Sequence, residues 1–131
     1  MQSEKQNLER HSVARVLISV SDKSAIDAFS KSLVKNGIEI VSTGGTSKIL
    51  SENGIAVTPV EDITKFPEMM NGRVKTLHPL IFGGILARDS DKSETEQYDI
   101  GIIDMVVCNL YPFGDVASKG VDMDALIEEI D

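Results

Sequence analysis

The sequence has little positive charge and almost no cysteine. It holds 13 basic residues against 21 acidic ones, which gives a net charge of −8, and one cysteine, Cys108. A single cysteine excludes an internal disulfide and agrees with a reducing cytoplasm, where we expect the protein to work. The acidic balance argues against nucleic acid and membranes as partners, because both bind to broad basic surfaces.

Long apolar runs and metal-binding patterns are also missing. No hydrophobic stretch approaches the ~20 residues that a membrane-spanning helix needs. No cysteine and histidine cluster has the spacing of metal ligands, and neither a P-loop nor a Gly-x-Gly-x-x-Gly motif occurs. Residues 1–14 mix both charges without an apolar stretch, which predicts a flexible leader rather than a secretory signal. The remaining residues, 15–131, are enough for one domain with a hydrophobic core.

Short β-branched runs alternate with stretches of helical spacing along this domain. The alternation predicts an α/β protein of three layers, with a parallel sheet and helices on both of its faces. Ser21–Ser24 is expected to cap the first helix, and Asn36-Gly37 to end it. The predicted strands cover 15–20, 38–41, 57–60 and 103–108, and the predicted helices follow 21–24 and 43–46, with a last one over 122–130.

Two strand-to-helix turns carry chemistry that suits an anion. Ser21-Asp22-Lys23 and Thr43-Gly44-Gly45-Thr46 both follow predicted strands, so parallel pairing would place them at the same edge of the sheet. Glycines allow close backbone approach, and a helix N-terminus attracts negative charge. Together the turns would surround one phosphate. The alternative is that each is an ordinary capped turn and that Lys23 is only solvated.

A local cluster of cations stands out against the acidic background. Arg73 and Lys75 follow the turn Asn71-Gly72 and would point to the same side of an extended segment. They could stabilise a phosphate, a carboxylate or a developing oxyanion; the alternative is an exposed basic patch. His78 could be a general acid or base, or have a structural role. Residues 61–79 lack periodicity, which is more typical of a functional loop than of filler.

Polar residues also follow the last predicted strand. Asn109 and Tyr111 lie just beyond its end, where an amide and a phenol could orient a ligand. Cys108 is expected to pack in the core, because nothing near it in the sequence favours a lowered thiol pKa.

Six motifs in this order resemble the N-terminal part of the PurH family of bifunctional purine biosynthesis enzymes. They are Ser19–Lys23, Thr43–Thr46, Phe66–Met69, Gly72–Pro79, Gly83–Arg88 and Asn109–Phe113. The resemblance runs from about Arg15 to Asp131, and its most specific parts are Gly72–Pro79 and Asn109–Phe113. That family joins an inosine monophosphate (IMP) cyclohydrolase domain to an aminoimidazole carboxamide ribonucleotide (AICAR) transformylase domain. The resemblance implies a methylglyoxal-synthase-like fold and a cytoplasmic homodimer.

The resemblance also implies an activity and a set of site residues. The cyclohydrolase closes the purine ring of formyl-AICAR to give IMP and water, without metal or cofactor; 10-formyltetrahydrofolate is the co-substrate of the transformylase. The implied catalytic residues are Lys75, Arg73, Tyr111 and Asp131. Lys75 would stabilise the oxyanion charge, and Tyr111 and Asp131 would orient the carboxamide and move its proton. The implied substrate-binding residues are Ser21, Asp22, Lys23, Thr43, Gly44, Gly45, Thr46, Arg73, Val74, Lys75, Thr76, Cys108 and Asn109.

Two departures from the family pattern accompany this resemblance. Phe82 stands where many relatives carry histidine. The pattern also continues past Asp131 into a glycine-rich turn and a helix with a lysine, so we expect an incomplete domain and no transformylase domain in this chain. Two other functions are compatible with the fold: a nucleotide- or phosphate-sensing regulatory module, and methylglyoxal synthase. A sensor would not need Arg73, Lys75 and Tyr111, and the synthase should carry a different loop with a catalytic aspartate.

Overall fold

The computed structural model describes residues 12–110, 113–120 and 122–124. Most of the predicted leader, Tyr111, Asp131 and most of the predicted last helix therefore lie outside the described residues. The elements, in chain order, are β1 (Arg15–Ser19), α1 (Ile26–Lys35), β2 (Glu39–Ser42), α2 (Gly44–Glu52), β3 (Thr58–Pro59), α3 (Val60–Thr64), α4 (Pro79–Leu86), the 3-10 helix η1 (Asp89–Asp91), α5 (Lys92–Gln97), β4 (Met105–Cys108) and α6 (Phe113–Ser118).

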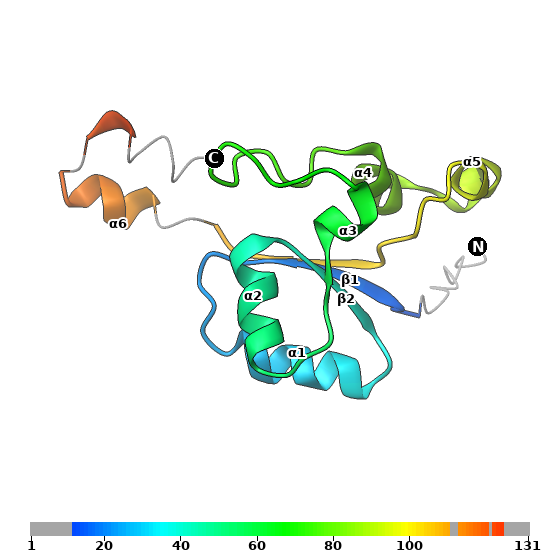
Figure 1. The fold of residues 1–131 in the computed structure, drawn as a ribbon, viewed down its shortest axis with the longest axis horizontal. Coiled ribbons are helices and arrows are strands. Elements are labelled where there is room, and N and C mark those ends of the chain that lie inside the picture. Colours follow the sequence, from blue (N-terminus) through cyan, green and yellow to red (C-terminus); the bar gives the residue numbers. More distant parts are fainter. Residues whose placement is uncertain (1–11, 111–112, 121, 125–131) are drawn as a thin grey trace, which may run out of the picture.

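The strands form one parallel sheet in the order β3-β2-β1-β4. Ile18 of β1 pairs with Ser42 of β2 on one side and with Val107 of β4 on the other. All the strands therefore end at the same edge, and the turns that follow β1, β2 and β4 meet there. Figure 1 shows the sheet almost edge-on, with α1 and α2 on one side and α3 and α4 on the other. The three-layer α/β prediction is confirmed.

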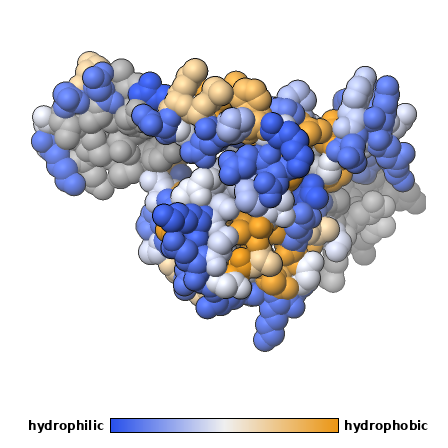
Figure 2. Space-filling model, viewed as in Figure 1, coloured by the Kyte–Doolittle hydropathy of each residue, from blue (hydrophilic) through white to orange (hydrophobic). Residues whose placement is uncertain are grey.

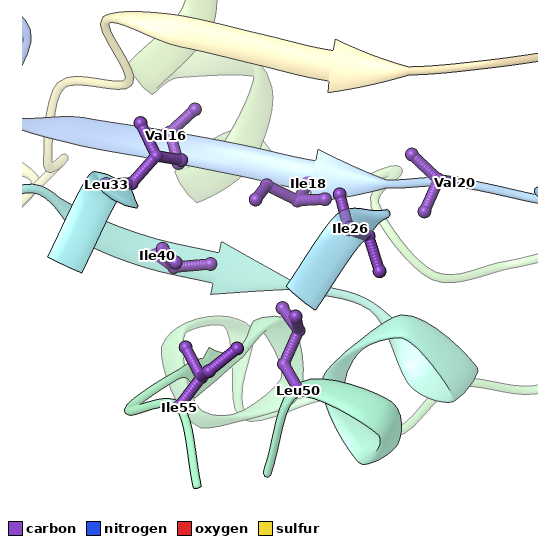
Figure 3. Close-up of a cluster of buried hydrophobic side chains, with 8 residues drawn as sticks. All are labelled: Val16, Ile18, Val20, Ile26, Leu33, Ile40, Leu50 and Ile55. Atoms are coloured by element: carbon purple, nitrogen blue, oxygen red, sulfur yellow. The ribbon is translucent and has the colours of Figure 1, made fainter. Parts of the chain in front are cut away.

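Alternate side chains of β1 and β2 build a separate core on each face of the sheet. Val16, Ile18 and Ile40 point to the face covered by α1 and α2, where they join Leu33 and Leu50 (Figure 3). The opposite face buries the intervening residues of the same strands against α3 and α4; this second core contains Leu17, Val41, Val60, Ile81 and Ile103. Burial on both faces explains why these strands read as continuous apolar runs.

The boundary of β3 differs from the prediction. The strand predicted over 57–60 pairs only at Thr58 and Pro59, and Val60 begins α3. Pro59 has no N–H group to continue the ladder and serves as the residue before the helix, with an extended backbone. Val60 is buried, as expected for a residue of a core strand, but it is buried as the first residue of α3. Part of the segment 61–79 is therefore helical rather than irregular.

The start of α1 also differs from the prediction. No side chain of Ser21–Ser24 caps this helix, which begins at Ile26 after Ala25 in a left-handed conformation. Asp22 instead accepts hydrogen bonds from the backbone and hydroxyl of Ser24, which closes a local turn ahead of the helix. Asn36, followed by Gly37, ends α1 as predicted.

Hydrophilic residues cover much of the face shown in Figure 2, with hydrophobic residues gathered in patches between them. In the part of the chain that the structure describes, no helix combines the length and the apolar character required for a membrane span.

Ser30 is a polar residue inside the first core face. It is fully buried on α1, and its hydroxyl finds no hydrogen-bond partner among the described residues. A buried hydroxyl without a partner costs free energy. We expect Ser30→Ala to raise the free energy of unfolding by about 1 kcal/mol, measured by urea denaturation. Ser32→Ala, on the exposed side of the same helix, controls for helix propensity; an equal gain in both variants would contradict the explanation from burial.

Candidate functional site

Asn109 connects the end of β4 to the turn that follows β1. Its side-chain Oδ1 accepts hydrogen bonds from the backbone N–H groups of Ser21 at 2.7 Å and Asp22 at 3.0 Å. Its Nδ2 donates to the carbonyl oxygen of Asp22 at 2.9 Å. All three bonds span 87 or 88 residues of sequence, so this one amide fixes the turn against the neighbouring strand.

Thr43 and Thr46 hold the start of α2 against the end of β1. The Thr43 hydroxyl donates to Ser19 Oγ at 2.9 Å, and the Thr46 hydroxyl bonds the backbone of Val20 at 3.3 Å. Both threonines are buried, whereas Gly44 and Gly45 are exposed. The threonine hydroxyls thus bond within the fold, and the backbone of the two glycines presents the beginning of α2 to solvent.

Lys23 places a positive charge beside the start of α2. Its Nζ donates to the carbonyl oxygens of Val20 at 2.9 Å and Ser21 at 3.3 Å. A Cβ added to Gly45 would lie 3.5 Å from Lys23 Cε and 3.9 Å from its Nζ. The ammonium and the helix N-terminus therefore act on the same small region, and both favour an anion there.

Asp22 keeps the turn between β1 and α1 in shape. Hydrogen bonds from the backbone N–H and the hydroxyl of Ser24 hold the pKa of Asp22 below its ordinary value, and the positive charge of Lys23 acts in the same direction. Asp22 is exposed and stays ionised at neutral pH. The stability that it contributes is present above the ordinary carboxyl pKa and is lost as the pH falls through the lowered one.

The cationic segment follows a tight hairpin-like turn. Met69 and Val74 form an antiparallel bridge, and Met70, Asn71 and Gly72 between them have positive φ angles of 55°, 56° and 81°. Arg73 is exposed, and the side chains of Val74, Lys75 and Thr76 are half-buried. A small open hollow adjoins this segment; it is lined by Thr64, Phe66, Pro67, Val74, Lys75, Leu77 and His78.

Glu68 lies between the start of α2 and the turn that precedes the cationic segment. A Cβ added to Gly44 would lie 2.6 Å from Glu68 Oε2, and one added to Gly72 would lie 2.6 Å from Glu68 Oε1. The two glycine turns, 28 residues apart in sequence (72 − 44), are thus neighbours across one carboxylate. Sequence reasoning did not select Glu68 as a site residue, because a single exposed glutamate carries no signal without its tertiary surroundings.

The remaining candidates divide into three groups. His78 has a structural role: its Nδ1 accepts a hydrogen bond from the Leu80 N–H at 3.1 Å and caps α4, with Pro79 as the first residue of that helix. Cys108 is exposed, so the expectation that it packs in the core is wrong. It ends an edge strand whose half-buried positions alternate with exposed ones. Tyr111 and Asp131 lie outside the described residues.

The structure brings most of the predicted site residues to one place. Ser21–Lys23, Thr43–Thr46 and Asn109 share the carboxyl edge of the sheet, and Gly72, which precedes the cationic segment, lies near Gly44 across Glu68. Among the described residues, no three histidine, cysteine, aspartate or glutamate side chains are grouped to hold a metal ion. The arrangement offers backbone N–H groups and the ammonium of Lys23 to a ligand that carries an anionic group.

Two comparisons with known proteins agree with this architecture. The model of the family described as "MGS-like domain" matches residues 25–131. A solved structure titled "Crystal structure of ForH" is 37% identical, with a TM-score of 0.68, and the match covers 76% of this chain and 54% of that one. The present chain thus spans about half the length of the ForH structure.

Proposed function

The chain belongs to the MGS-like domain family, and from this premise we propose that it is the IMP cyclohydrolase domain of a PurH-type enzyme. The observation that supports the proposal is that the turns after β1 and β2 lie at one sheet edge and that Gly72, next to Arg73, lies near the second of them across Glu68. The motif resemblance supplies the substrate, formyl-AICAR, and the product, IMP. The two turns suit its phosphate, and the cationic segment suits the reacting part of its base.

The reaction needs positioning and charge stabilisation more than strong acid or base chemistry. The carboxamide nitrogen attacks the formyl carbon and forms a C–N bond, while the formyl oxygen takes up negative charge. The carboxamide nitrogen loses one proton and the formyl oxygen takes up a proton. The C–O bond then breaks as the formamide nitrogen loses its proton and forms the C=N bond of the ring, so that the oxygen leaves with two protons as water. Because attacking and attacked groups belong to one molecule, holding them in contact supplies much of the acceleration.

The proposed roles follow from where the residues lie. The backbone of Gly44 and Gly45, with Lys23 beside them, would bind the phosphate. Lys75 would stabilise the oxyanion on the formyl oxygen, with Arg73 as the neighbouring cation. Tyr111 and Asp131 would orient the carboxamide and carry its proton, as the resemblance implies. Val74, Thr76, Cys108 and Asn109 would complete the surroundings of the base.

The proposal extends to the longer protein that the family implies. In that protein a transformylase domain would use 10-formyltetrahydrofolate to make formyl-AICAR, the two domains would belong to a cytoplasmic homodimer, and nucleic acid, membranes and metal ions would have no part in the reaction. Neither step draws on a redox cofactor.

The direct test is to incubate formyl-AICAR with the full-length protein and follow IMP by absorbance and chromatography. We expect IMP to appear at a rate proportional to the protein concentration, above the uncatalysed rate. A folded protein that leaves this rate unchanged would contradict the proposal. Release of methylglyoxal from dihydroxyacetone phosphate would favour methylglyoxal synthase instead, and phosphate or nucleotide binding without turnover of either substrate would favour a sensing module.

A further inference from the structure

Glu68 holds a carboxylate at the place where the proposed site should receive the phosphate. Its two oxygens face different turns, Oε2 towards Gly44 and Oε1 towards Gly72. Gly44 is the first residue of α2, a helix of nine residues. The carboxylate therefore lies at the positive end of a helix, in a space that both glycines leave open by lacking a Cβ.

The surroundings of Glu68 permit it to leave this position. The residue is exposed, and within the part of the chain that the structure describes its carboxylate makes no hydrogen bond or ion pair. Its neighbours Thr64 and Phe66 bond to each other instead, at 3.2 Å. Rotation about the side-chain bonds of a glutamate would move the charge away without unfolding the turn.

A carboxylate and a phosphate cannot share the start of α2 without repulsion. Two like charges a few ångströms apart destabilise each other even near a protein surface, where the effective dielectric constant is intermediate. Lys23 and the N-terminus of α2 attract the Glu68 carboxylate and a bound phosphate alike. The phosphate must therefore displace Glu68 or bind more weakly beside it.

We propose that Glu68 is a built-in competitor for the phosphate group of the substrate. Its carboxylate occupies the entrance between Gly44 and Gly72, and it turns outward when the nucleotide binds. The residue would keep the affinity for the substrate and the product moderate and so favour release of IMP. This inference rests on the proposed function, because it takes the start of α2 as the phosphate site.

Isothermal titration calorimetry with IMP and with inorganic phosphate tests the competition. We expect Glu68→Gln, which keeps the shape and removes the charge, to lower the Kd for both ligands by about ten-fold. Glu61→Gln is the matched control, because Glu61 is exposed on α3 and the substitution makes the same change in net charge. We expect this control to change each Kd by less than about two-fold.

The two ligands separate failure of the inference from failure of the proposed function. Equal or weaker binding of both ligands by Glu68→Gln would overturn the competition, and weaker binding of IMP alone would mean that Glu68 contacts the nucleotide directly. Tighter binding of phosphate by Glu68→Gln in a protein that does not bind IMP would uphold the competition and contradict the nucleotide site. No binding of either ligand to the folded variants would overturn both.

Discussion

Lys75→Ala is expected to lower kcat/KM for IMP formation by about 10²- to 10³-fold, the usual effect of removing one group that stabilises an oxyanion. Lys75 is half-buried beside the hollow lined by Val74 and His78, where partial exclusion of water strengthens its interaction with a developing charge. The loss should fall mainly on kcat, because negative charge develops on the formyl oxygen in the transition state and is absent from the bound substrate. Steady-state kinetics of the full-length protein with formyl-AICAR measures it.

Two further variants show whether the lower kcat/KM of Lys75→Ala reflects the charge and shape of this side chain. Lys48→Ala removes an exposed lysine of α2 and should leave kcat and KM unchanged. Lys75→Arg keeps the charge but presents a planar guanidinium instead of a compact ammonium, and should recover only part of the activity. A Lys75→Ala enzyme with normal kcat and a raised KM would assign this lysine to binding rather than to the chemical step.

The sheet could be predicted from the sequence because its strands bury both faces. Val16, Leu17 and Ile18 are all apolar, and the structure sends them alternately to the two cores. A run without alternation is the expected signature of a central parallel strand. The same rule explains the error at Val60, which is also apolar and buried, but in α3. A short buried run does not by itself distinguish a strand from a helix turn.

Helix α4 shows a second limit of sequence patterns. It begins at Pro79, contains Gly83 and Gly84 at its centre and is almost wholly apolar, so it lacks the amphipathic period that marks a surface helix. Gly84 is required by close packing, because a Cβ there would collide with the carbonyl oxygen of Gly101. Such a requirement is set by the partner loop, which the sequence of the helix does not reveal.

The candidate site could likewise be predicted only in part from the sequence. The turns after β1, β2 and β4 could be located from the sequence, because the carboxyl ends of parallel strands must meet. The sequence could not show which side chains form hydrogen bonds within the fold, because these bonds depend on distances between segments far apart in the chain. Thr43, Thr46 and Asn109 all use their polar groups on backbone or side-chain partners of the β1 end, and Glu68 enters the site only through tertiary placement.

Asn109→Leu is expected to weaken IMP binding by about 10- to 30-fold, which corresponds to roughly 1.4 to 2 kcal/mol. The substitution removes the acceptor for the Ser21 and Asp22 N–H groups and the donor to the Asp22 carbonyl. The turn that carries Lys23 would then lose its attachment to β4, and its charge would no longer be held beside Gly45. Asn109→Asp keeps the acceptor but loses the donor and adds a negative charge beside the turn, so it should also weaken IMP binding.

Titration with inorganic phosphate and with IMP shows how Asn109 acts. If the amide positions the turn after β1, inorganic phosphate, which has no base, should lose affinity for Asn109→Leu by the same factor as IMP does. If the amide instead contacts the base, as the family resemblance implies, phosphate binding should stay at the wild-type level while IMP binding falls. Asn36→Leu, which removes an exposed amide from the far end of α1, should leave both affinities unchanged. The hydrogen bonds of Asn109 lead us to expect the parallel loss, because its oxygen and its nitrogen are already bonded to the turn.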